Sequence, residues 1–406
     1  MQLIYITTFM FHKEEGETWG LPSCSDSFFG KYLDVFDSVR VIGEEIKGYL
    51  NKSALVKMKN TDIEVCILPK NTRPQDFTND RFVRKRLEEE IAKAEAILIK
   101  PSSRRGMMAI KIAEKLNKPY MIEMTGDIYN ALVQSLSWVK RMYAPLLYKQ
   151  ITKAIRKCEF GLYVSQDYLQ KKYPIKGTIC GCSDVVLEKS DTQVLQSRFQ
   201  KIDWMKPDDV VNLALIGFYQ GNGKGVDTAL RAISRLPVNF QLSVLGNGTE
   251  ENRQKWYAYA KVHGVSKDRL HFPSPLSSPQ EVLHWLDDYD FFVFPTRSEG
   301  LPRVLVEAMS RGLPCFATNI CTMPELLPAE CLFELDDDKK LAELLLSYYQ
   351  DKALMKFIAN VNFEHSKDYD AEILTIKRNA FLTEFRNYCE VFKEEANDKN
   401  KRDAIC

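Results

Sequence analysis

Two acids frame a glycine turn in the second half of the chain. The segment Thr296–Met309 reads Thr-Arg-Ser-Glu-Gly-Leu-Pro-Arg-Val-Leu-Val-Glu-Ala-Met, with Glu299 and Glu307 eight residues apart. Gly300 permits a tight turn with close backbone approach, and Pro302 suits the first turn of a helix. The free N–H groups that begin such a helix favour a phosphate or another anion. A carboxylate at Glu307 would suit two sugar hydroxyls, because each hydroxyl is a hydrogen-bond donor.

Each acid also has an ordinary structural explanation. An acid such as Glu299 in a first helical turn can complement the helix dipole, and a helical glutamate is commonly solvated. Glu307 fits that explanation less well, because it lies beside an apolar stripe that would hold the helix on a sheet. The stripe consists of Val304, Leu305, Ala308 and Met309.

The elements that must position this turn alternate between strands and helices. Continuous apolar strands separated by helical segments predict parallel sheets covered on both faces. The predicted strands of the first half are Leu3–Thr7, Ser38–Ile42, Ile63–Leu68, Ala96–Ile99, Tyr120–Met124, Gly161–Val164 and Gly177–Ile179. Those of the second half are Val211–Gly217, Phe240–Leu245, Leu270–Phe272, Phe291–Pro295 and Cys315–Thr318.

A polar stretch at Glu188–Asp209 interrupts this alternation and predicts a domain boundary. Residues 1–204 would form one doubly wound, Rossmann-like unit and residues 205–370 a second, the two facing each other across a central cleft. A long amphipathic helix is predicted over residues 371–393 and would pack back on the first unit. Residues 394–406 form a charged tail, which we expect to be disordered.

Composition excludes several classes of function. The 406 residues include 56 Lys plus Arg and 55 Asp plus Glu, a net charge of +1 that gives no global attraction to nucleic acid. The longest apolar runs are too short to span a bilayer, and the start of the chain lacks the basic leader and cleavage site of a signal peptide. The ten cysteines form no CxxC pair and are most simply reduced thiols. We therefore expect a cytoplasmic protein, or one peripheral on the cytoplasmic face of the membrane.

The order of residues around the glycine turn resembles a known family. Glu-x7-Glu within Ser298–Pro314 is similar to the signature of the retaining family-4 glycosyltransferases, which have the GT-B fold. Upstream, Leu213–Asp227 resembles that family's strand, glycine loop and Lys-Gly that begin the second domain. Downstream, Pro314–Thr318 and Met323–Glu325 match its next strand and its Pro-Glu turn. Three shorter segments resemble the branch that builds capsular and other surface polysaccharides: Ser27–Tyr32, Glu123–Asp127 and Tyr163–Ser165.

This resemblance implies three catalytic residues. Lys224 would contact the diphosphate of a nucleoside-diphosphate sugar, and Glu299 would hold hydroxyls of the donor sugar. Asp127 matches an acid of the family's first domain. A solvated loop lysine is the alternative interpretation of Lys224.

The resemblance also implies a set of donor-binding residues. Glu307 would hold the ribose hydroxyls, the backbone of the glycine turn would lie beside the sugar and diphosphate, and Ser274 would pack near the base. The full set is Glu307, Gly300, Leu301, Pro302, Gly217, Phe218, Gly225, Ser274 and Arg303. The nucleotide sugar is itself the substrate, so the expected cofactor is none.

Two positions depart from the family pattern. Members usually carry Arg directly after the glycine that corresponds to Gly217, where this chain has Phe218. Many also place His before the acid that matches Asp127, where this chain has Gly126. The first change removes a cation from the leaving diphosphate, and Arg297 or Arg303 could replace it.

A metal site is not expected. Asp288-Tyr289-Asp290 has the Asp-x-Asp spacing that binds a metal in the other major glycosyltransferase fold, but it lies where an acid would end the turn before a strand. The five histidines are scattered without the spacing of metal ligands. They are His12, His263, His271, His284 and His365.

The sequence gives fewer indications of which residues would bind the acceptor. The segment Met10–Gly20 would be a glycine-containing loop after the first strand, and its Lys13 and Trp19 could line the cleft. The stretch Trp138–Lys157 mixes aromatic and aliphatic residues with Lys and Arg. Such a basic amphipathic surface could rest on anionic lipid, giving peripheral contact with the inner membrane surface. The alternative is a core helix with a solvated basic face.

The sequence therefore predicts a two-domain GT-B glycosyltransferase. It would move a sugar from a nucleotide donor to a glycan or lipid-linked glycan acceptor, with retention of anomeric configuration, in surface polysaccharide biosynthesis. Two alternatives remain: a GT-B nucleotide-sugar epimerase, and a non-catalytic partner that binds nucleotide sugar.

Overall fold

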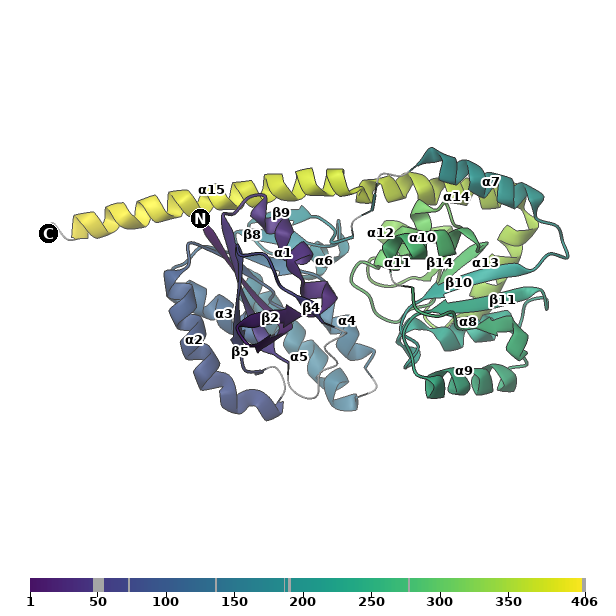
Figure 1. Cartoon of the computed structure of the whole chain (residues 1–406), viewed down its shortest axis with the longest axis horizontal. Helices are drawn as coiled ribbons and strands as arrows, with labels where there is room; N and C mark the ends of the chain where they lie inside the picture. Colours follow the sequence, from purple (N-terminus) through teal and green to yellow (C-terminus); the bar gives the residue numbers. More distant parts are fainter. Residues whose placement is uncertain are drawn as a thin grey trace. The chain divides into compact units, whose positions relative to one another are not determined.

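The computed structural model describes residues 1–46, 55–71, 74–135, 137–185, 187–188, 191–276 and 278–403. The chain separates into two compact units. The first consists of Met1–Thr125, Pro145–Cys182 and Thr375–Cys406, and the second of Gly126–Ala144 and Ser183–Leu374. Each unit contains a largely parallel sheet with helices packed on it, which confirms the two predicted α/β units (Figure 1).

The first unit is built on a nine-stranded sheet. Its main strand order is β4-β2-β1-β6-β7-β8-β9, and β3 pairs with both β1 and β5. The strands are β1 (Gln2–Glu14), β2 (Glu17–Gly20), β3 (Ser38–Glu45), β4 (Val56–Lys57), β5 (Ile63–Leu68), β6 (Ala96–Ile99), β7 (Tyr120–Met124), β8 (Phe160–Tyr163) and β9 (Thr178–Gly181). The pairings of β2 are antiparallel, and those among the other strands are parallel.

Helices pack on this sheet. They are α1 (Asp26–Leu33), α2 (Asp80–Lys93), α3 (Arg104–Lys115), α5 (Trp138–Ile155), α6 (Tyr168–Lys172) and α15 (Ala371–Asp403), of which α5 and α15 begin in the second unit and continue into the first. The C-terminal helix α15 packs on the first unit, where Phe381 and Phe385 place their rings 5.8 and 5.4 Å from that of Phe160. Arg386, farther along α15, donates a hydrogen bond to the carbonyl of Val35.

The second unit holds a six-stranded sheet in the order β12-β11-β10-β13-β14-β15, with every pairing parallel. Its strands are β10 (Val211–Ile216), β11 (Phe240–Leu245), β12 (Leu270–His271), β13 (Phe291–Phe294), β14 (Cys315–Thr318) and β15 (Leu332–Phe333). The helices of this unit are α4 (Ile128–Val133), α7 (Thr192–Trp204), α8 (Val226–Ile233), α9 (Glu250–Val262), α10 (Pro279–Asp287), α11 (Arg303–Ser310), α12 (Met323–Leu326), α13 (Asp338–Gln350) and α14 (Lys352–Ser366).

Two neighbouring strands at the centre of this sheet determine where the candidate site forms. All four residues of β13 are buried, as expected for an apolar strand with both faces covered. β10 and β13 pair in parallel with Leu213 opposite Phe291. The loops that follow the two strands therefore emerge at the same edge of the sheet, where open α/β folds bind their ligands.

The segment Met10–Gly20 differs from the predicted loop. β1 continues to Glu14 and forms an antiparallel hairpin with β2. The turn uses Glu15 and Gly16, with φ values of 51° and 83°, a left-handed conformation that glycine adopts without strain. The polar residues of this segment concealed the strand, because only one face of a hairpin needs to be apolar.

The C-terminal prediction was wrong in its boundary. The helix does not end at residue 393 but continues to Asp403, through part of the charged segment expected to be disordered. In the part of the chain that the structure describes, no helix combines the length and the apolar character needed to cross a membrane.

Candidate functional site

The loops after β10 and β13 are joined by polar contacts. Lys224 ends the short 3-10 helix Asn222–Lys224 after β10, and its ammonium forms an ion pair with Glu299 from the loop after β13. The hydroxyl of Thr296 lies 3.0 Å from Glu299 Oε1 and 3.2 Å from the carbonyl oxygen of Gly223. The N–H of Arg297 donates to that carbonyl at 2.9 Å. The structure thus brings together two of the predicted catalytic residues.

Two glycines make room for this arrangement. A Cβ atom at Gly217 would lie 2.6 Å from Cγ of Lys224, so the lysine stem crosses directly over this residue. Gly225 has a φ of +71°, and a Cβ there would lie 1.9 Å from the carbonyl oxygen of Pro295. Gly225 therefore requires glycine, whereas a Cβ at Gly217 would have to displace the Lys224 side chain.

Glu307 occupies a buried position on α11. Only 9% of the residue is exposed, and burial raises the pKa of its carboxyl, partly offset by the positive charge of Arg303. Among the described residues, none donates a hydrogen bond to this carboxylate. A buried acceptor pair without donors is suited to a ligand that brings its own hydroxyl groups.

Arg297 is already engaged within the protein. Its guanidinium binds both carboxylate oxygens of Asp227 at 2.9 Å, and it also contacts Asp336 and the carbonyl of Asn222. Burial of Asp227 would raise its pKa, but the hydrogen bonds of Arg297 and the charges of Arg297 and Arg231 outweigh burial and lower it. Arg297 therefore ties α8 to the glycine turn and is not a free replacement for the missing family Arg. Arg303, by contrast, is exposed at the start of α11.

Asp127 lies beside the glycine turn. Its carboxylate caps α4 by accepting a hydrogen bond from the N–H of Asn130 at 3.1 Å. The Asn130 amide in turn donates to the carbonyl of Arg297 at 3.1 Å, and a Cβ on Gly126 would lie 3.8 Å from Cα of Gly300. The residue is buried. The carboxylate that caps α4 is also the group with the predicted catalytic role.

The remaining donor-side residues differ in exposure. Pro302 is the buried N-cap residue of α11 and directly follows Leu301. Phe218 is 62% exposed, and Ser274 is exposed in the segment after β12. The expected position of Ser274 near the base of the donor stays a prediction.

Sequence reasoning missed a pair of threonines at this site. Thr296 supports Glu299, as described above, and the hydroxyl of the fully buried Thr322 donates to the carbonyl of Gly300. Thr296 lies two residues after β13, at the end of the strand where ligands bind, which is a signal that could have identified it. Thr322 is 22 residues from its partner and carries no local signal.

The two predicted acceptor-side residues lie in the first unit, on the hairpin of β1 and β2. Lys13 is exposed and pairs in register with Thr18, while Trp19 is half-buried and pairs with His12. Lys13 also lines a pocket of about 580 Å³ whose other walls come from β3, β5 and α2. A role in acceptor binding stays a prediction for both.

A polar cluster that the sequence did not reveal lies at the carboxyl edge of the first sheet. Glu123, the fourth residue of β7, is almost fully buried and accepts a hydrogen bond from the Tyr32 hydroxyl at 2.6 Å and another from the Tyr5 hydroxyl. Lys100 Nζ lies 3.5 Å from its carboxylate and 4.3 Å from the ring centroid of Phe9. The cluster is internally paired, which explains how a carboxylate is tolerated at this depth.

Asp290 of the Asp-x-Asp segment has a structural role. Its carboxylate accepts a hydrogen bond from the N–H of Asn212 at 2.8 Å and lies 3.2 Å from Nζ of Lys201. These contacts tie the start of β13 to β10 and to α7. They agree with the interpretation of this acid as the end of a turn.

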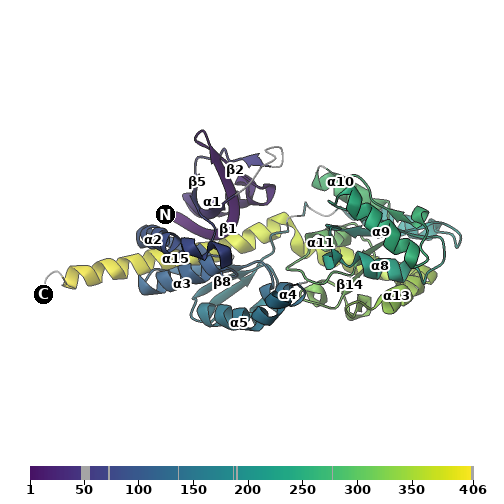
Figure 2. The same cartoon turned by 90° about the horizontal axis from the view of Figure 1, so that it is seen from below.

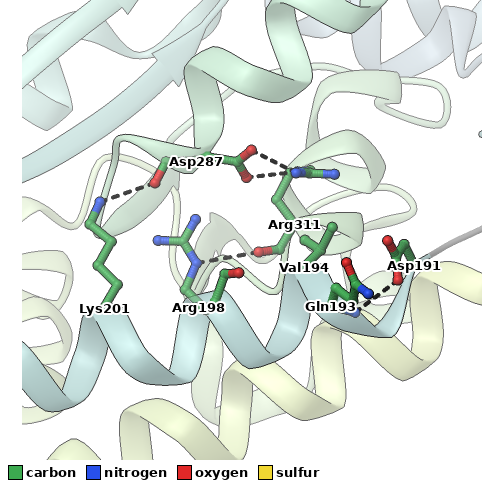
Figure 3. A pocket seen from close by; sticks show the side chains of 8 residues that line it. Asp191, Gln193, Val194, Arg198, Lys201, Asp287 and Arg311 are labelled. Atoms are coloured by element: carbon green, nitrogen blue, oxygen red, sulfur yellow. Dashed lines mark hydrogen bonds and ion pairs between the residues drawn. The ribbon is translucent and has the colours of Figure 1, made fainter.

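A second cavity, of about 320 Å³, lies beside α7 (Figure 3). Arg198 donates to the carbonyl of Arg311 at 3.3 Å, Lys201 to that of Asp287 at 3.1 Å, and the Arg311 guanidinium binds the Asp287 carboxylate. Burial lowers the pKa of Arg198 to about 10, and three main-chain carbonyls accept from its guanidinium. These cations fasten α7 to the second sheet, and none of them belongs to the candidate donor site.

Comparison with known proteins places the candidate site in a family context. Residues 211–351 match the family model described as "Glycosyl transferases group 1". This range contains Lys224, Glu299 and Glu307. Among curated proteins, the chain is 25% identical to Protein CapJ of Staphylococcus aureus over 395 residues, covering 95% of this chain and 96% of CapJ. It is 30% identical over 139 residues to the putative colanic acid biosynthesis glycosyltransferase WcaL of Escherichia coli, covering 31% and 33% of the two chains.

Solved structures share the fold over nearly the whole chain. Sucrose-phosphate synthase from Thermosynechococcus elongatus matches with a TM-score of 0.63 and 14% identity, covering 97% of this chain and 99% of that one. HepE of Anabaena, solved in complex with UDP and glucose, matches with a TM-score of 0.62 and 12% identity, covering 94% and 99%. The fold is GT-B. The match of residues 211–351 to the family model supports a glycosyltransferase.

Proposed function

We propose that this protein transfers a sugar from a nucleoside-diphosphate sugar to a glycan or lipid-linked glycan, with retention of anomeric configuration, in the biosynthesis of a surface polysaccharide. The observation that carries this proposal is the ion pair of Lys224 with Glu299 in the loop that leads into α11, the helix that carries the buried Glu307. A cation, a helix N-terminus and two carboxylates suit a diphosphate flanked by hydroxyl-bearing groups. The E. coli relative WcaL, whose name assigns it to colanic acid biosynthesis, supports the polysaccharide context.

The donor would use both sides of the glycine turn. Lys224 and the N–H groups at the start of α11 would bind the diphosphate, and Glu299 would accept hydrogen bonds from the sugar. Glu307 would hold the ribose hydroxyls, since its carboxylate faces no donor from the described part of the chain. Lys224 has further N–H donors beyond the one that faces Glu299, so it can bind both groups.

In the proposed mechanism, the acceptor hydroxyl attacks on the face from which the diphosphate leaves. One oxygen of the leaving diphosphate takes the proton of the acceptor hydroxyl. The protein acts by holding the two substrates together and by stabilising the negative charge that develops on the diphosphate. Lys224 and α11 supply that stabilisation, so we propose that no metal is obligatory. We further propose a cytoplasmic location, where nucleotide sugars are made, with Lys13 and Trp19 on the acceptor side.

Binding of candidate donors tests the first step. Thermal shift with a panel of nucleoside-diphosphate sugars, starting with UDP-glucose because the HepE structure contains it, should reveal one preferred base and sugar. A ligand at about 100 times its Kd stabilises the folded state by about 2.7 kcal/mol. Stabilisation that Glu307→Ala weakens supports the proposed site. Equal stabilisation of the variant and the natural protein would place the donor elsewhere.

Analysis of the product then tests the reaction class. With the donor identified, retention predicts that the new glycosidic bond has the anomeric configuration of the donor, which NMR coupling constants report. An inverted product would contradict the proposed mechanism. Conversion of the donor into a second nucleotide sugar would instead identify an epimerase.

A further inference from the structure

A buried arginine lines the cavity beside α7. Only 3% of Arg198 is exposed, and its guanidinium donates hydrogen bonds to the main-chain carbonyls of Leu286, Tyr289 and Arg311. Among the described residues, no carboxylate lies within ion-pair distance of this guanidinium. Buried charges in proteins are normally paired, because burial penalises the charged form. The charge of Arg198 is instead met at close range by neutral carbonyl groups of the described chain.

Two further cations line the same cavity, Lys201 and Arg311. The Lys201 ammonium lies 3.2 Å from the carboxylate of Asp290, and it shares the carbonyl of Tyr289 with Arg198. Burial lowers the pKa of Arg198 to about 10, and it also lowers the pKa of Lys201. The neighbouring acids therefore do not fully offset the burial of these two charges.

The two acids that line the cavity are already engaged. Both carboxylate oxygens of Asp287 accept hydrogen bonds from Arg311, at 2.7 and 2.6 Å. The carboxylate of Asp191 accepts a hydrogen bond from the N–H of Gln193 at 2.9 Å, in the first turn of α7. Three cations and two acids line the cavity, so positive charge is in excess there.

The cavity offers hydrogen-bond donors and room for a small molecule. A guanidinium has more N–H groups than the three that the carbonyls engage in Arg198, and Asp287 engages only Nε and Nη2 of Arg311. The exposed side chains of Gln193 and Ser197 add an amide and a hydroxyl at the rim. The volume of about 320 Å³ falls within the range of about 300–1,000 Å³ that small-molecule sites occupy.

This cavity and the candidate donor site lie at opposite edges of the second sheet. The carbonyls of Leu286 and Tyr289 lie at the end of α10 and just before β13, and Arg311 follows α11 and precedes β14. The two helices pack against each other within this unit (Figure 2). The candidate donor site is instead formed by the loops that follow β10 and β13. A ligand in the cavity would therefore leave the donor site free.

We propose that this cavity binds a phosphate-bearing small molecule, with the phosphate held between Arg198 and Arg311. The fixed fork of a guanidinium matches the oxygens of a phosphate, and such charge-assisted hydrogen bonds are the strong ones. A phosphate also supplies the anionic partner that the buried Arg198 lacks. An uncharged sugar fits less well, because it would leave the excess positive charge in place. The proposal goes beyond glycosyl transfer and does not depend on it.

Calorimetric titration of the full-length protein tests the proposal without any donor or acceptor. The probes are inorganic phosphate, glucose 1-phosphate and, as the uncharged control, glucose. We expect saturable binding of both phosphates and none of glucose, and added salt should weaken the binding because it screens the charges. Absence of saturable binding of the phosphates at low salt, or equal binding of glucose, would overturn the proposal.

A charge added at the rim locates the site without disturbing the buried contacts. Ser197→Glu places a carboxylate beside the cavity and should weaken phosphate binding by about tenfold or more, through repulsion between like charges. The matched control is Gln196→Glu, an exposed position of the same helix that does not line the cavity. Equal weakening in the two variants would mean that total charge governs binding, and would overturn the proposal.

A variant of the candidate donor site separates the two sites. Lys224→Ala should retain the phosphate binding that Ser197→Glu removes, because Lys224 lies at the other edge of the sheet. Phosphate binding that Lys224→Ala abolishes and Ser197→Glu leaves intact would assign the phosphate to the donor site and overturn the proposal.

Discussion

Lys224 is the residue on which the proposed chemistry depends most. Its ammonium lies against Glu299, and its stem crosses Gly217, so the side chain is positioned before any ligand arrives. Phe218 replaces the Arg that the family resemblance leads one to expect, and Arg297 is held by Asp227. The charge at this edge of the sheet therefore rests on Lys224, α11 and the exposed Arg303.

Substitution of Lys224 should act mainly on the chemical step. Negative charge grows on the diphosphate as the sugar bond breaks, so a nearby cation stabilises the transition state more than the bound donor. We expect Lys224→Ala to lower kcat by about 10²–10³, the range for loss of one preorganised electrostatic group. Donor KM should change much less. Lys111→Ala, on an exposed part of α3, is the control, and a near-normal kcat for Lys224→Ala would assign leaving-group stabilisation to other residues.

We expect the buried carboxyl of Glu307 to make donor binding depend on pH. The ionised form accepts hydrogen bonds from two hydroxyls, and burial raises the pKa above that of an ordinary glutamate. As the pH falls through this raised pKa, the carboxyl gains a proton and donor affinity should fall. Glu307→Gln should weaken donor binding at neutral pH by about 1.5–3 kcal/mol and remove this pH step. Calorimetric titrations across the acidic range measure both effects.

The stability of the same variant provides a control. Because the pKa is raised in the folded state, ionisation of Glu307 costs stability as the pH rises above the value for the unfolded chain. Glu307→Gln should therefore leave Tm at neutral pH unchanged or higher. A lower Tm combined with weaker binding would indicate a structural role instead.

At the scale of elements, the loop between β10 and α8 is shaped by its glycines. A Cβ at Gly217 would displace the Lys224 stem, which it would approach to 2.6 Å, whereas a Cβ at Gly221 meets no atom within 4 Å. We expect Gly217→Ala to lower kcat by about tenfold or more, since displacement of a positioned group weakens its electrostatic contribution. Gly221→Ala should retain near-normal kcat. Similar values for the two variants would show that the path of the lysine stem is unimportant.

The elements also show what the sequence could predict. The strands Ile63–Leu68, Ala96–Ile99, Tyr120–Met124, Phe240–Leu245 and Cys315–Thr318 have the predicted bounds, because each is an apolar-rich run that its own residues define. The two-residue strands β4 and β15 are too short to show a periodic pattern. The hairpin of β1 and β2 differs from the predicted loop because its outer face is polar.

Within the candidate site, the sequence predicts the elements formed by neighbouring residues but not the contacts between residues far apart in the chain. The strand, glycine turn and helix from Phe291 to Ser310 follow from local residue types, and the structure contains them. The ties of Arg297 to Asp227 and Asp336 join residues 70 and 39 positions apart. Such contacts depend on which strands are neighbours in the sheet, and no spacing along the chain indicates them.

At the scale of the whole molecule, the proposed mechanism requires no metal. In this mechanism Lys224 and the N-terminus of α11 would stabilise the diphosphate, while Asp290 already binds Asn212 and Lys201. We therefore expect transfer activity to survive excess chelator. A complete loss of activity that Mg²⁺ or Mn²⁺ restores would contradict the mechanism and indicate Asp288 and Asp290 as metal ligands.

The central claim is that the Lys224–Glu299–Glu307 group catalyses glycosyl transfer and does not merely bind nucleotide sugar. Incubation of the protein with its donor and a cell-envelope acceptor extract, followed by mass spectrometry of the glycans, tests this directly. We predict one nucleoside diphosphate released for each acceptor that gains the mass of one sugar residue, with both signals lost together in Lys224→Ala. A protein that binds the donor yet yields neither product, or a Lys224→Ala variant as active as the natural protein, would contradict the claim.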